Sequence, residues 1–173
     1  MTDKIFQELL SIKAIVKLNE AEKENYLKFF NETYKDNLSA AYDNLKSHPR
    51  WSIISGYYAM HDLAKLFLAK KYNLKIVERV HLATIASLYS ISKENKEFEK
   101  AIELLKQANK IFNSQIKGIK ASDMAFYLKK ARKEREKVQY YNPRTDLKQT
   151  GEQANFFLNE IVIPFIKLLE SLI

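Results

Sequence analysis

The sequence predicts an all-α fold, a bundle of six or seven helices. The 173 residues contain only three glycines and three prolines, far fewer than the many tight turns of a β-sandwich or barrel require. Hydrophobic residues make up 46% of the chain and recur at helical spacing along most of it. A chain of this length and composition is expected to fold as one domain over residues 1–173.

Six or seven helices follow from the apolar periodicity and its interruptions, because the first two ranges could also form one long bent helix. Pro49 suits the first turn of a helix but disfavours helix at the residue before it, so it separates two helices. Gly118 and Pro143 end two later helices, and Pro164 predicts a kink in the last one. The most apolar helix is expected to be central, with Trp51 in the core. The expected ranges are 4–18, 22–46, 49–72, 80–91, 92–117, 122–141 and 146–173.

Several classes of protein are excluded by what the sequence lacks. It contains no cysteine, so it forms no disulfide, thiolate zinc site or iron–sulfur cluster, and a cytoplasmic location is expected. The longest stretch without a charged residue, 80–92, is shorter than the roughly 20 residues of a membrane span. The histidines lack metal-ligand spacing and the glycines are isolated, so we expect neither a metal nor a cofactor.

Positive charge is concentrated near the C-terminal third of the chain. Residues 117–148 contain ten basic and four acidic residues, which gives +6 of the total net charge of +8. This distribution is expected where a basic surface faces an anionic partner such as RNA or a nucleotide phosphate. A solvated helix face with interleaved Lys and Glu would give the same pattern.

Arg135 is the candidate residue of this segment. On the helix expected there it occupies a seam with Met124, Leu128, Ala131 and Val138, where a core residue would be expected. Because a guanidinium stays charged, Arg135 requires an anionic ligand, an interface or a buried ion pair. A line of polar side chains on the same side could bind phosphate through arginine and a base edge through amides. This line consists of Arg132, Arg135, Gln139 and Asn142.

Two stretches of the chain resemble the HEPN family, the "higher eukaryotes and prokaryotes nucleotide-binding" domain. The run SGYYAMHDLAK at 55–65, followed by KKY at 70–72 and then His81, is similar to that family's second helix. The run ARKEREKVQYY at 131–141 is similar to its late helix, which bears an arginine followed after four to six residues by histidine. With the helical pattern, the likeness covers most of the chain beyond about residue 38.

The resemblance implies an antiparallel bundle with a four-helix core, extended here by N- and C-terminal helices, and usually a homodimer. Many HEPN proteins are metal-independent endoribonucleases, and some are toxins paired with a nucleotidyltransferase-type antitoxin. In this chain Tyr140 occupies the histidine position, with Tyr141 and Asn142 after it. Tyrosine, with an ordinary pKa of about 10, is a poor base near neutral pH.

The sequence therefore predicts binding of RNA or a nucleotide phosphate without efficient turnover, and it leaves open whether the chain is an enzyme. One alternative is a toxin-like endoribonuclease in which Arg135 and Tyr140 are catalytic. The other is a purely protein-binding subunit. His61 is interpreted either as a hydrogen-bonded histidine at the rim of the core or as a proton carrier that lines the same cleft as Arg135.

Overall fold

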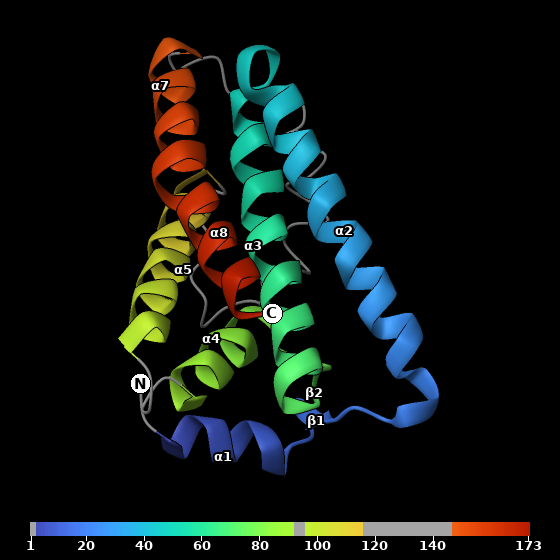
Figure 1. Cartoon of the computed structure of the whole chain (residues 1–173). Coiled ribbons are helices and arrows are strands. Elements are labelled where there is room, and N and C mark those ends of the chain that lie inside the picture. The colour runs from blue at the N-terminus through green and yellow to red at the C-terminus, as the bar shows by residue number, and fades with distance from the viewer. Residues whose placement is uncertain (1–2, 92–95, 116–146) are drawn as a thin grey trace, which may run out of the picture.

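The computed structural model describes residues 3–91, 96–115 and 147–173. These residues form an all-α bundle, as predicted, with a small two-stranded ribbon (Figure 1). The helices are α1 (Asp3–Ser11), α2 (Glu20–Ser47), α3 (Pro49–Tyr72), α4 (Val80–Ile91), α5 (Lys96–Gln115), α7 (Leu147–Phe157) and α8 (Ile163–Leu172). The strands are β1 (Ile15–Lys17) and β2 (Leu74–Ile76), and a π-helical segment, η3 (Leu158–Val162), joins α7 to α8.

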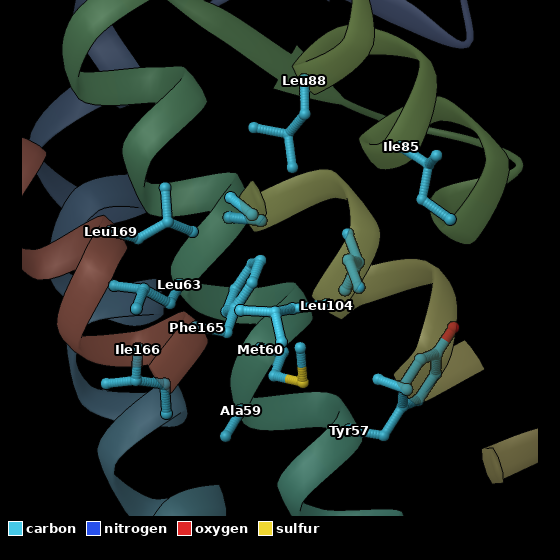
Figure 2. Packing of buried hydrophobic residues seen from close by; sticks show 14 of the residues in the cluster. Tyr57, Ala59, Met60, Leu63, Ile85, Leu88, Leu104, Phe165, Ile166 and Leu169 are labelled. Atoms are coloured by element: carbon cyan, nitrogen blue, oxygen red, sulfur yellow. The ribbon is translucent and has the colours of Figure 1, made fainter. Parts of the chain in front are cut away.

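Helix α3 is the centre of the bundle. It lies between α2 on one side and α5, α7 and α8 on the other (Figure 1). Its side chains are therefore buried on more than one face: Tyr57, Met60 and Leu63 have almost no exposed surface. Figure 2 shows these residues packed with Phe165 of α8 and Leu104 of α5. The prediction that residues 49–72 form the central helix is confirmed.

Local signals set both ends of α3. Pro49 occupies the first turn, where its missing N–H costs nothing. Asn73 ends the helix in the left-handed conformation, with φ of 54°, and its backbone N–H bonds back to the carbonyl of Ala69. Asn tolerates this conformation better than most residues because its short polar side chain bonds locally. The Asn73 carbonyl also accepts the N–H of Leu18, which places the ribbon beside the end of α3.

The prediction of one helix over residues 4–18 is wrong. Helix α1 ends at Ser11, Lys13 adopts a positive φ of 59°, and residues 15–17 pair antiparallel with β2. In this ribbon Ile15 lies opposite Ile76, and both side chains are buried. Burial against a strand distant in sequence overrides the helical spacing of the local apolar residues.

The distortion predicted at Pro164 takes the form of the π-helical segment η3. Because Pro164 lacks an N–H, the carbonyl of Glu160 cannot receive the usual helical bond from it. Just before Pro164, the N–H of Ile163 bonds to the carbonyl of Leu158, five residues earlier, which is the spacing of a π-helix. Helix α8 leaves this segment in a different direction from α7 (Figure 1).

The prediction that Trp51 is a core residue is wrong. Its side chain is 60% exposed, whereas Ser52 and Ile53 beside it are buried. Trp51 lies in the first turn of α3, three residues after the helix N-cap His48. Trp51 lies on the same face of α3 as Tyr58, two turns later, which is also exposed, so this face is less covered than the one that carries Ser52 and Ile53.

Candidate functional site: a buried tyrosine–histidine–asparagine cluster

Four polar side chains meet inside the bundle where α3, α4 and α5 converge. Helix α3 contributes Tyr57 and His61, which are one turn apart and therefore share a face. His81 stands at the start of α4, and Asn109 lies on α5. We call Tyr57, His61, His81 and Asn109 the polar cluster. In Figure 2 the Tyr57 side chain extends from α3 toward α5.

The hydrogen bonds of the polar cluster run through the Tyr57 hydroxyl and the His81 ring. The Tyr57 hydroxyl donates to Asn109 Oδ1 at 2.9 Å and lies 2.9 Å from His81 Nδ1. His81 Nδ1 also lies 3.3 Å from Nε2 of His61. The two imidazole rings meet edge to face, with centroids 4.6 Å apart and an interplanar angle of 84°.

The donors in this chain of hydrogen bonds can be assigned because a hydroxyl carries one hydrogen. Tyr57 gives that hydrogen to the Asn109 carbonyl oxygen, so its contact with His81 requires Nδ1 of His81 to be the donor. The same nitrogen lies 3.3 Å from His61 Nε2, so a hydrogen bond between the two rings requires His61 Nε2 to be the acceptor. In a neutral ring, His61 therefore carries its proton on Nδ1.

His61 Nδ1 has no hydrogen-bond partner among the described residues. The residue is only 1% exposed, so water does not reach it freely. A buried donor without an acceptor costs on the order of 1–3 kcal/mol. The cluster therefore includes one unsatisfied group, at the more deeply buried of its two histidines.

Burial keeps both imidazoles neutral. The pKa of His61 lies well below its ordinary value, first because burial disfavours the cation and then because His81 and Lys65 are close. The pKa of His81 is lowered for the same reason, with Lys65 as the second cause. Burial also raises the pKa of Tyr57, so its hydroxyl stays protonated. At neutral pH the polar cluster carries no charge.

Lys65, one turn after His61, belongs to an ion pair that borders the cluster. Its ammonium lies 2.9 Å from Oδ1 of Asp62, and the two side chains are only 13% and 12% exposed. The other carboxylate oxygen of Asp62 accepts the Asn37 amide of α2 at 3.0 Å. The ammonium also lies 4.7 Å from the centre of the Phe30 ring. The carboxylate of Asp62 therefore already binds Lys65 and Asn37. The positive charge of Lys65 helps to lower the pKa of both His61 and His81.

The structure places His61 within the core, where it bonds to a second histidine. The other candidate residues from the sequence, Arg132, Arg135, Gln139, Tyr140 and Asn142, lie outside the described residues. So does the expected helix over 122–141, which carries all of them except Asn142. Sequence reasoning did not identify Asn109 or the contact between His61 and His81. The only signal was the spacing of Tyr57 and His61, which put them on one helix face.

Comparisons of the chain with protein-family models, curated proteins and solved structures find no match. Within residues 3–91, 96–115 and 147–173, no helix is both long and apolar enough to cross a membrane. In the same part of the chain, no three His, Cys, Asp or Glu side chains gather as a metal site would require.

Proposed function

We propose that this protein binds RNA or a nucleotide phosphate through the basic segment 117–148, with Arg135 at the centre of the site. Arg132, Gln139 and Asn142 assist it. The observation that carries the proposal is the distribution of charge along the chain. The segment carries a net +6 in 32 residues, whereas the remaining 141 residues carry 19 basic and 17 acidic ones, a net +2. A dense group of Lys and Arg binds nucleic acid favourably because it releases the counterions held by the phosphates.

Most of the excess positive charge of the protein lies in the basic segment and not on the described helices. The packed helices α3, α4 and α5 surround a continuous apolar core, and the charges outside the basic segment nearly balance. The likeness of residues 55–65 and 131–141 to HEPN proteins points to the same class of ligand. On that likeness we further propose that the protein acts as a homodimer in the cytoplasm.

The test is a salt titration of RNA affinity with the full chain. The dissociation constant for a fluorescent single-stranded RNA is measured by anisotropy over a range of salt concentrations. We expect the logarithm of the association constant to fall with log salt by about 0.7 for each phosphate contact. Arg135→Ala should lower the affinity and reduce the slope, and Arg135→Lys should also bind more weakly because lysine lacks the planar fork.

Two substitutions on α2 give a matched control. Lys28→Ala and Lys46→Ala each remove one positive charge from an exposed position outside the basic segment. If these variants lose as much affinity as Arg135→Ala, the binding is not centred on Arg135. If the wild type shows no salt-dependent affinity, the protein does not bind RNA through phosphates, and a protein-binding role becomes the better interpretation.

The same preparation separates binding from catalysis. In HEPN ribonucleases the 2′-hydroxyl of the RNA attacks the adjacent phosphodiester, so the products end in 2′,3′-cyclic phosphate and no metal is needed. We expect RNA incubated with the protein in chelator to remain intact, because Tyr140 replaces the family's histidine. Cleavage that Arg135→Ala and Tyr140→Phe abolish would instead establish the endoribonuclease.

A further inference from the structure

We propose that the polar cluster is an acid-sensitive contact that holds α4 on α3 and loosens it when His61 gains a proton. The inference is independent of nucleic-acid binding. It follows from the donor assignment of the cluster, from the depth at which His61 is buried, and from the charges around it.

Protonation of His61 would occur at Nε2, because Nδ1 already carries a hydrogen in the neutral ring. Nε2 is the atom that faces the N–H of His81 at 3.3 Å. After protonation two N–H donors would point at each other, so the hydrogen bond between the rings would be lost and replaced by repulsion. Protonation of His81 at Nε2 would leave its Nδ1 donor in place. His61 is therefore the ring whose protonation removes one of the two hydrogen bonds that join His81 of α4 to α3.

Among the described residues, the groups around His61 would not stabilise a positive charge on its buried ring. Lys65, one turn away, is positive, and the carboxylate of Asp62 is shared between Lys65 and Asn37. Helix α5 presents the uncharged Asn109, and α4 presents His81. The elements packed on α3 and α4 carry further charged or titratable groups at half-buried or exposed positions. They include Lys4, Glu8, Tyr58, Lys75, Tyr89, Lys100, Glu103, Lys106 and Lys110, together with Glu22 and Tyr26 of α2, Glu152 of α7 and Glu170 of α8.

The direction of the pH effect follows from the lowered pKa values. A histidine that is harder to protonate in the folded protein contributes stability above its unfolded pKa of about 6.5. That stability is lost as the pH falls from this value toward the folded pKa. Each such histidine lowers the folding equilibrium constant by up to about tenfold per pH unit. With His61 and His81 both lowered, the loss reaches about a hundredfold per unit over that range.

The first experiment compares urea unfolding of the full chain at pH values from about 8 to about 5. We expect the wild type to lose stability below about pH 6.5 with close to two protons taken up on unfolding. His61→Phe, which keeps a ring of similar shape but cannot titrate, should remove about half of this pH dependence. The matched control is His48→Gln, at the exposed junction of α2 and α3, which should leave the wild-type profile unchanged.

The second experiment uses the wild type, so it does not depend on whether a variant folds. Long-range proton–nitrogen spectra of the histidine rings report which nitrogen carries the proton and where each ring titrates. We expect the Nδ1–H form for His61 and His81, with titration below the ordinary range of histidine. Hydrogen exchange at decreasing pH should show that the amides of α4 lose protection before those of α2.

Two results would overturn the proposal. One is a His61 ring that carries its proton on Nε2, or that titrates in the ordinary range of histidine at about pH 6.5, because the donors would then not oppose each other. The other is a pH dependence of stability that is the same in His61→Phe as in the wild type. Loss of protection throughout the molecule, with no earlier opening of α4, would equally exclude a local release.

Discussion

Gly56 lies where α3 packs tightly against the C-terminal helices, α7, η3 and α8. A Cβ atom added at this position would lie 3.1 Å from Cγ2 of Val162 and 3.3 Å from Cε1 of Phe157. Both distances are shorter than ordinary van der Waals contact, and both neighbours are fully buried. At Gly151 of α7 the same added atom meets nothing within 4 Å. The two glycines therefore separate the effect of packing from that of helix propensity.

Alanine is favoured over glycine inside a helix by about 0.8–1.0 kcal/mol. We expect Gly151→Ala to stabilise the protein by about this amount, because nothing opposes the new methyl group. At Gly56 the same gain is offset by overpacking, which costs about 1–3 kcal/mol in a well-packed core. Gly56→Ala is therefore expected to lie about 1–3 kcal/mol below Gly151→Ala and to be neutral or destabilising relative to the wild type.

A double-mutant cycle with Val162→Ala identifies the clash. Val162→Ala removes the Cγ2 atom nearest to the methyl group that Gly56→Ala adds. By itself Val162→Ala leaves a cavity, but in the double variant the new methyl group can occupy that space. We expect the double variant to be more stable than the sum of the single effects by about 1 kcal/mol or more. Urea unfolding of the four proteins measures this coupling from the midpoints and slopes.

The reasoning is refuted if Gly56→Ala is as stabilising as Gly151→Ala. It is also refuted if the two changes at the contact add within about 0.5 kcal/mol, the range found for independent sites. Either result would mean that α3 and the C-terminal helices are not held at the separation that the structure shows.

Three further predictions concern side chains outside the polar cluster. Tyr34→Phe removes the hydroxyl that donates to Glu170 at 2.9 Å and should lower the unfolding free energy by about 0.5–1.5 kcal/mol, measured in urea. Trp51→Ala should change stability by less than about 1 kcal/mol, against about 3–5 for a core tryptophan, because its side chain is 60% exposed. Burial raises the pKa of Tyr26 and of Tyr34 to about 12. These two tyrosines therefore contribute stability that is present below about pH 10 and lost as the pH rises toward 12, which alkaline unfolding followed by tyrosinate absorbance would detect.

Where structure is governed by local chemistry, the sequence was a sufficient guide. The bounds of α3 and α4 agree with the predicted ranges 49–72 and 80–91. Pro49 can begin a helix but not continue one, and Asn73 readily takes the left-handed turn that ends one. The all-α fold follows in the same way from few glycines, few prolines and sustained helical periodicity.

Where two distant segments meet, local patterns were insufficient. Residues 15–17 have apolar spacing compatible with a helix, and the pairing with residues 74–76 that makes them a strand is invisible in either segment alone. The exposure of Trp51 likewise depends on what packs against its face of α3, which apolar spacing does not show. Periodicity identifies an apolar face but cannot say what covers it.

The sequence by itself determined the helical class, the basic segment 117–148 and the shared helix face of Tyr57 and His61. Only the tertiary structure brought His81, twenty residues beyond His61, and Asn109 of α5 to that face. The reason is physical: helix formation depends on neighbours along the chain, whereas the charge state of a histidine depends on whatever atoms the packed core places around it.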